Sequence, residues 1–370
     1  FIIIIAIIVG LFFHYTGMLD RTKDTKINSG RAPINSSELT SEADTFDAKE
    51  KEDELKAQLQ KQSSKISSED VTNILLIGED IRDTEEESRG NTDVMMIISI
   101  NTKNKTITMT SLMRDMYIYM AQFDEGNRLN SAYWHGGCEY LEQCIEDYFG
   151  IQIDRYARVN FYSFIDIVET VGGIDMEVSK AEAEGMKKPM AEQNKYLKNK
   201  KGTDYISDDI FAGKSDEDKV KLHLNGNQAL AFARLRYVGN SDYERTERQR
   251  RVISEIITES KKLSLVQLDK LLNKVLPEIN TDLTDGEIAN LLNAFDYMKY
   301  DIQQLRIPAD GYFTNEVIYS MDVLNPDFAA NSAFIQYIVY GSCKNIDEAI
   351  KQYQEENAYN YSYDTGYYGY

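Results

Sequence analysis

Arginine is concentrated in one short stretch of this chain. Of fifteen arginines in 370 residues, six lie in the segment AFARLRYVGNSDYERTERQRRVI, residues 231–253. The chain as a whole carries a formal net charge of -20, so solubility does not require such a cluster. Two interpretations follow. Either the arginines form a solvated helix face balanced by Glu244 and Glu247, or they converge on a bound anion.

The spacing within the segment places part of the cluster on one helix face. For a helix that starts near Thr246, Arg245 and Gln249 stand at i and i+4, with Arg248 beside them. A helix N-terminus favours an anion, and guanidinium groups added there would form a cradle for phosphate or pyrophosphate.

Two further arginines precede this helix. Arg234 and Arg236 stand two residues apart in a stretch predicted to be short and extended, so their side chains should point the same way. Asp242 lies between this pair and the helix.

Acidic and basic residues also flank three apolar stretches that precede the cluster. Asp80 follows the first stretch, Arg89 and Asp93 flank the start of the second, and Arg114 follows the third. Open α/β sheets place ligands at strand ends. Two carboxylates without a nearby His or Cys favour a hard cation, Mg²⁺ or Mn²⁺, held together with substrate phosphates. Asp80 and Asp93 are therefore the candidate metal ligands.

Strands alternate with helices through the middle of the chain, which predicts an α/β fold with layered α-β-α architecture and a central mixed sheet. Apolar runs predict strands at 73–77, 93–100, 105–113, 151–159 and 174–178. Helical spacing predicts helices at 139–149 and 161–171, one capped near Asn225, and a longer one ending near 260. The polar stretch 184–219 is predicted to be a loop.

The two ends of the chain differ from this middle part. The apolar run over residues 1–19 predicts a transmembrane anchor whose start precedes the numbering, with a cleaved signal peptide as the alternative. Residues 20–70 are polar and predict an extended or partly helical stalk that buries no core, before a catalytic domain over 71–345. The Tyr-rich residues 346–370 predict a disordered tail.

Two classes of site are disfavoured. Cys138 and Cys144 are predicted on one helix, where six residues rise about 9 Å, too far for a disulfide, so idle buried thiols are expected. The acidic net charge argues against nucleic acid as a partner, because phosphate neutralisation needs a broad basic surface.

Five ordered motifs resemble those of the LytR-CpsA-Psr family of membrane-anchored bacterial cell-wall enzymes. They are NILLIGED, RGNTDVMMIISI, SLMRDMY, NSAYWHGG and LNGNQALAFARLRY followed by DYERTERQRRVI, within residues 71–260. The resemblance implies metal binding by Asp80 and Asp93, and pyrophosphate binding by Arg114, Arg234 and Arg236. The residues that its last motif adds to this site are Asp242, Arg245, Arg248 and Gln249. Arg89 is a looser match that Arg82 could replace, and Met113 stands where the family usually has Pro.

The resemblance also implies an activity and a location. It predicts a single-pass membrane protein whose extracytoplasmic domain transfers an anionic glycopolymer from undecaprenyl pyrophosphate to peptidoglycan through a phosphodiester. Phosphoryl transfer depends mainly on positioning and on cationic groups that stabilise developing charge, which suits this set of residues. Two alternatives remain open: a non-catalytic scaffold that binds the lipid-linked polymer, and a pyrophosphatase in which water is the nucleophile.

Overall fold

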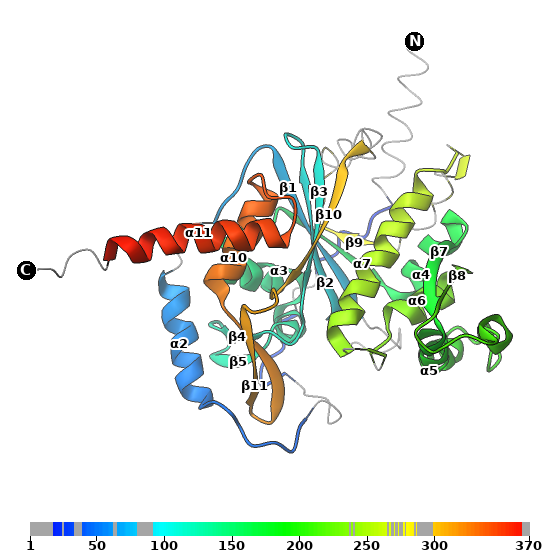
Figure 1. The fold of residues 1–370 in the computed structure, drawn as a ribbon, viewed down its shortest axis with the longest axis horizontal. Coiled ribbons are helices and arrows are strands. Elements are labelled where there is room, and N and C mark those ends of the chain that lie inside the picture. The colour runs from blue at the N-terminus through cyan, green and yellow to red at the C-terminus, as the bar shows by residue number, and fades with distance from the viewer. Residues whose placement is uncertain are drawn as a thin grey trace, which may run out of the picture. The chain divides into compact units, whose positions relative to one another are not determined.

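Figure 1 shows the computed structural model of the chain. Its described residues are 18–23, 26–32, 39–61, 65–79, 92–236, 238–239, 241–264, 266–267, 270, 273, 277, 279–284, 286 and 299–364. For residues 241, 242 and 358–364 only the backbone is described.

The main sheet has six strands in the order β10-β3-β2-β1-β6-β9. The strands are β1 (Val71–Glu79), β2 (Thr92–Asn101), β3 (Thr106–Leu112), β6 (Arg155–Asn160), β9 (Asn280–Thr281) and β10 (Asp301–Ile307). β10 runs parallel to β3, whereas β2 is antiparallel to β3, so the sheet is mixed. The predicted α/β fold with a central mixed sheet is therefore confirmed.

The chain divides into two compact units, and β1, β2 and β6 contribute residues to both. Unit 1 comprises Phe1–Lys23, Ile77–Val94 and Ala157–Met298. Unit 2 comprises Asp24–Leu76, Met95–Tyr156 and Lys299–Tyr370. Nearly all the predicted site residues that the structure describes belong to unit 1; Arg114 belongs to unit 2.

The described part of unit 2 combines hairpins with α-helices. The hairpins are β4 (Tyr117–Met120) with β5 (Glu125–Arg128), and β11 (Phe313–Ile318) with β12 (Met321–Pro326). The helices are α2 (Ala48–Lys61), α3 (Asn130–Phe149), α10 (Phe328–Val339) and α11 (Ile346–Asp364). Aromatic rings join α3 to α10, with the Tyr148 and Phe328 ring centroids 4.4 Å apart.

Two polar segments are more ordered than their composition predicts. In the predicted stalk, α2 packs on β4 and β5 and buries Leu55, which is 1% exposed. In the predicted disordered tail, α11 packs on α10 and buries Ala349. In each helix a few buried residues among many polar ones anchor the segment, which composition averaged over the segment does not reveal.

Unit 1 is built around helices and one hairpin. Its elements are α4 (Phe161–Val171), β7 (Ile174–Ser179), α5 (Lys180–Tyr196), β8 (Lys219–Leu224), α6 (Gly226–Ala233) and α7 (Ser241–Ser260). The prediction of a loop from 184 was wrong over α5. Ala183, Met186 and Met190 stand at helical spacing and enter the unit 1 core, and a capping box between Ser179 and Glu182 starts the helix.

The cysteine prediction is confirmed, because Cys138, Cys144 and Cys343 are all free and buried. Burial raises the pKa of Cys144 to about 12, so its thiol stays protonated and unreactive at neutral pH. Residues 1–17 of the predicted anchor lie outside the described residues. Among the helices that are described, none has the length and apolarity to cross a membrane.

Candidate active site

Helices α6 and α7 carry the arginine cluster. α6 begins where predicted, because the Asn225 side chain accepts the backbone N–H of Gln228 at 2.9 Å and the Gln228 side chain accepts that of Asn225 at 3.0 Å. α7 begins at Ser241, earlier than the predicted start near Thr246. Arg245 therefore lies in the second turn of α7, and the helix N-terminus does not account for its role.

Asp93 lies between two of the predicted arginines. Its Oδ1 atom is 3.4 Å from Nη2 of Arg236 and 3.8 Å from Nη1 of Arg245. Arg245 is 3% exposed, whereas Asp93 and Arg236 keep 29% and 26% of their side chains exposed. Two guanidinium groups thus approach one carboxylate, and the partial exposure of Asp93 and Arg236 lets a solvent-borne anion reach them.

The strand start next to Asp93 is fixed by buried hydrogen bonds. The hydroxyl of Thr92 is fully buried and lies 2.8 Å from the carbonyl oxygen of Gly78 and 2.9 Å from that of Val94. A hydroxyl has one proton, so it donates to one carbonyl at a time. This contact joins the end of β1 to the start of β2. It therefore fixes the backbone position of Asp93, the next residue of β2.

Arg234 contacts different groups from Arg236, contrary to the prediction that the two point the same way. Arg234 is the C-cap of α6 and keeps helical backbone angles, so the extended geometry assumed for the pair is absent. Its guanidinium lies over the Phe161 ring at 4.6 Å, 3.5 Å from Glu192 and 3.4 Å from Gln193 Oε1. A stacked guanidinium keeps its charge and a fixed plane.

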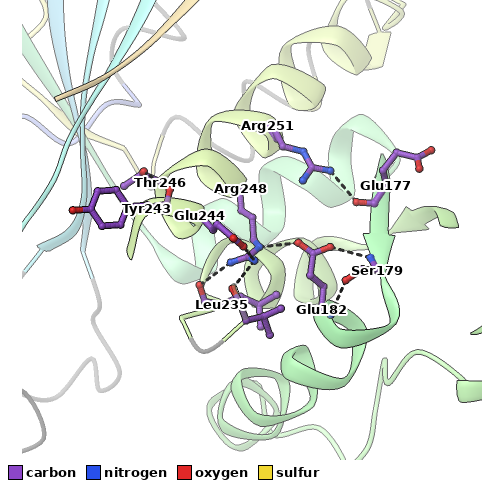
Figure 2. A network of polar contacts seen from close by, with 10 residues as sticks. Glu177, Ser179, Glu182, Leu235, Tyr243, Glu244, Thr246, Arg248 and Arg251 are labelled. Carbon is purple, nitrogen blue, oxygen red and sulfur yellow. Dashed lines mark hydrogen bonds and ion pairs between the residues drawn. The ribbon is translucent and has the colours of Figure 1, made fainter. Parts of the chain in front are cut away.

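Arg248 is the most enclosed member of the cluster (Figure 2). Its Nε donates to Glu182 at 2.9 Å, and Nη2 donates to Glu244 at 2.7 Å and to the Val238 carbonyl at 2.9 Å. Nη1 lies 3.4 Å from the Leu235 carbonyl. With 3% of the side chain exposed, these contacts tie α7 to α5 and to the 235–239 loop.

The 235–239 loop carries Arg236 and fits closely against α7. Gly239 has a φ of +76°, and a Cβ atom there would lie 1.9 Å from the Glu244 carboxylate. The positive φ favours glycine, and a Cβ atom would also force the Glu244 carboxylate to move away. Gln249 approaches the preceding helix end, with its Nε2 atom 3.5 Å from the Ala233 carbonyl.

Some predicted residues cannot be placed in this site. Asp80, Arg82 and Arg89 lie outside the described residues, and the side chain of Asp242 is not described. Among the side chains that are described, no group of three or more His, Cys, Asp or Glu could hold a metal ion.

Arg114 has its own environment in unit 2. It is 9% exposed, and its Nε lies 3.5 Å from Asp115 Oδ1. Arg128, which the sequence did not single out, approaches the same oxygen at 3.3 Å and donates to the Asp322 carbonyl at 2.7 Å. Arg128 stands out in the structure because it is buried, and the surrounding sequence EGNRLN has no pattern that predicts burial.

Unit 1 contains an ion pair that the sequence also did not predict. Arg158 Nη1 lies 3.2 Å from the Glu79 carboxylate, which is 3% exposed and ends β1 directly before Asp80. A buried carboxylate needs such a partner.

A histidine in the β7–β8 hairpin gives unit 1 a pH-dependent contact. His223 Nδ1 is 2.7 Å from the Asp175 carboxylate and Nε2 is 2.7 Å from the Gly172 carbonyl oxygen. These two acceptors, Asp175 first, raise the pKa of His223. The doubly protonated ring satisfies both contacts.

We expect this contact to stabilise the fold mainly in mildly acidic solution. Because the folded pKa of His223 is raised, its contribution is fully present below the unfolded value of about 6.5 and is lost as pH rises through the folded value. The melting temperature of His223→Gln should therefore fall below that of wild type by more at about pH 5.5 than at about pH 8.5. Calorimetry across this range tests it, and an equal difference at both values would contradict it.

Comparison with known proteins identifies the family. The family model described as the LytR_cpsA_psr family matches residues 35–333. A polyisoprenyl-teichoic acid–peptidoglycan teichoic acid transferase TagU from Bacillus mycoides (strain KBAB4) is 28% identical over 253 residues, which cover 68% of this chain and 73% of that protein.

Solved structures share the fold. Protein gbs0355 from Streptococcus agalactiae has a TM-score of 0.56 and 25% identity, covering 74% of this chain and 88% of that one. TagT bound to LI-WTA has a TM-score of 0.54 and 19% identity, covering 80% and 94%. Because the family model spans most of the sequence, the chain belongs to the LytR_cpsA_psr family.

Proposed function

We propose that this protein is an extracytoplasmic phosphotransferase that moves an anionic glycopolymer from undecaprenyl pyrophosphate to peptidoglycan. The observation that carries the proposal is the partly exposed arrangement of Asp93 with Arg236 and Arg245. A pyrophosphate needs cationic groups held in fixed positions, and this arrangement supplies them. The similarity to a protein named as a teichoic acid transferase agrees with it.

The reaction assigns a task to each group. A hydroxyl oxygen of peptidoglycan attacks the phosphorus that carries the glycopolymer, and the hydroxyl proton is released. The bond from that phosphorus to the bridging oxygen breaks, so undecaprenyl phosphate leaves with that oxygen. Arg236 and Arg245 stabilise the negative charge that accumulates on the pyrophosphate, and Asp93 holds both guanidinium groups in place.

A divalent cation fits this arrangement. Mg²⁺ or Mn²⁺ is commonly held by one or two carboxylates together with substrate phosphates, and Asp93 presents a partly exposed carboxylate beside the proposed phosphate position. Asp80 would be the second ligand. When bound, the cation would neutralise charge on the pyrophosphate.

The lipid and the membrane complete the proposal. The predicted anchor over residues 1–19 would hold the domain at the outer surface of the cell membrane, and helices would cover both faces of the sheet. α4 is a candidate lining for the lipid chain, because Phe161, Tyr162, Ile165 and Ile167 are apolar or aromatic and only partly buried.

The direct test is transfer by the purified full chain, with a synthetic polyprenyl-pyrophosphate donor and peptidoglycan as acceptor. We expect glycopolymer joined to peptidoglycan by a phosphodiester, detected by mass spectrometry after muramidase digestion. Release of polymer phosphate without attachment would instead support the pyrophosphatase alternative. Binding of the donor without any reaction would support the scaffold.

We expect both the charge and the planar guanidinium of Arg236 to contribute to transfer. Arg236→Ala should reduce kcat/KM about ten- to a hundredfold, because a charge-assisted bond to phosphate contributes about 1.5–3 kcal/mol. Arg236→Lys should remain impaired if the guanidinium makes two parallel bonds. Arg251→Ala is the matched control, because its Nη2 donates to the Glu177 carbonyl at 2.8 Å (Figure 2) and the residue has no assigned role in transfer. Equal activity of the wild type and all three variants would contradict the role of Arg236.

A further inference from the structure

Exposed lysines gather where α5 ends (green in Figure 1). Lys195, Lys198, Lys200 and Lys201 are all exposed, within a chain of net charge -20. Among the described residues none of these four has an ion-pair partner. We call them the lysine cluster.

Several other lysines of unit 1 are paired with acids. Lys187 contacts Asp208 at 3.0 Å, and Lys221 contacts Asp175 at 3.1 Å. The acids nearest in sequence to the lysine cluster are Glu192 and Asp204, each three residues from its end. Glu192 pairs with Arg234 at 3.5 Å, and the two oxygens of Asp204 accept hydrogen bonds from Asn225 and Asn227, both at 2.8 Å. The cluster therefore keeps its positive charge.

A buried amide network fixes the shape of the loop that carries three of these lysines. The side chain of Asn194, 1% exposed, donates to the Thr203 carbonyl at 2.9 Å and accepts from Asn199 at 3.2 Å and from Asn227 at 3.1 Å. Solubility alone does not require an exposed loop to be held this way. The hydrogen-bond network keeps the backbone of the loop in one conformation, and so keeps the three lysines of the loop in a fixed arrangement.

The same network reaches the candidate active site. Gln193, which precedes Asn194 and is 3% exposed, donates to the backbone and side-chain oxygens of Asn227 at 2.9 and 2.7 Å. Its own oxygen lies 3.4 Å from Nη1 of Arg234. The loop and Arg234 are thus held by one set of hydrogen bonds at the C-terminal end of α5.

We propose that the lysine cluster binds the phosphodiester backbone of the glycopolymer that follows the pyrophosphate. This inference rests on the proposed function and adds a second, charge-based contact for the donor. Lysine ammonium groups are compact charges without a fixed geometry, which suits a repeating and flexible polyanion. Tyr196, 43% exposed, adds an aromatic face for a sugar ring.

An anionic membrane surface would offer the same phosphate chemistry, but the segment does not suit it. Surface-bound segments present several large apolar side chains on the face opposite the charges. Within residues 195–201 Tyr196 is the large side chain that is exposed, and its apolar neighbour Leu197 is partly buried. The polymer is therefore the occupant that we infer.

The test uses the full chain with all four lysines changed to glutamine. Binding of a synthetic poly(glycerol phosphate) chain that carries no lipid is measured at several salt concentrations. We expect the variant to bind about tenfold or more weakly and with a smaller salt dependence, since four exposed contacts of modest strength are lost. The control variant changes Lys103, Lys214, Lys219 and Lys261, which are also exposed, and so matches the change in net charge.

A second measurement separates this inference from the proposed function. Transfer is compared for two polyprenyl-pyrophosphate donors, one with a single uncharged sugar and one with the polyanionic chain. The quadruple variant should lose transfer only with the long donor. If wild type transfers neither donor, the proposed function fails, while the binding measurement still decides this inference. Unchanged polymer binding by the variant, an equal loss in the control, or a loss confined to binding of phosphatidylglycerol vesicles would overturn it.

Discussion

Asp93→Asn is expected to reduce kcat for glycopolymer transfer at least about a hundredfold. Removing one preorganised electrostatic group from a reacting centre typically lowers kcat about a hundred- to a thousandfold. Here the carboxylate holds Arg236 at 3.4 Å and Arg245 at 3.8 Å. An amide lacks the negative charge that attracts both guanidinium groups, and it is a poor ligand for a hard cation.

The effect of the same change on donor binding separates the two roles of Asp93. If Asp93 only orients the arginines, its loss makes the site more positive, so KM for the pyrophosphate donor should stay constant or fall while kcat falls. If Asp93 also holds a cation together with the donor phosphates, KM should rise, and the rise should be larger at the lower Mg²⁺ concentration. Steady-state kinetics with varied donor, at two Mg²⁺ concentrations and with EDTA, separates the two constants. Asp175→Asn is the control, because Asp175 pairs with Lys221 and His223 on the hairpin and has no assigned role in transfer. Full activity of Asp93→Asn in EDTA would exclude both the orienting role and the metal site.

The elements that carry the arginines could be predicted because local signals specify them. Asn225 caps α6 through contacts three residues away, and Gly172 ends α4 in a left-handed conformation that glycine favours. α5 could not be predicted in the same way. Its buried Met186 and Met190 stand among lysines and glutamates, and only packing in the core distinguishes them from a solvated stretch.

The chemistry of the site was predictable by residue type, but its pairing was not. Arg236 meets Asp93 across 143 positions of sequence, and Arg248 meets Glu182 across 66. No local pattern encodes such separations. The sequence therefore could not distinguish an arginine that faces solvent beside Asp93 from one enclosed by protein oxygens. Arg248 was predicted to bind pyrophosphate, yet its environment favours a role in positioning the 235–239 loop.

Breaking the Arg248–Glu182 pair should strongly destabilise the protein. Arg248→Met would leave the Glu182 carboxylate buried, 8% exposed, without its charged partner and remove a donor from the Val238 carbonyl. Truncating one member of a buried ion pair typically costs about 3–5 kcal/mol. The exposed partner should matter less: for Glu244→Gln, whose side chain is 40% exposed, we expect a loss of about 0.2–1 kcal/mol. Urea denaturation of the full chain measures both.

A double variant then distinguishes positioning from direct phosphate binding. In Arg248→Met/Glu182→Gln no buried charge remains unpaired, and glutamine can still complete the capping box of α5, so much of the stability should return. Transfer should stay low, because the 235–239 loop has lost the donor that joins it to α7, and Arg236 moves with that loop. The loss should appear in kcat and KM together. If Arg248 instead binds the phosphate directly, Arg248→Met should lose transfer activity with little change in the free energy of unfolding. In that case Glu182→Gln alone should leave transfer activity intact.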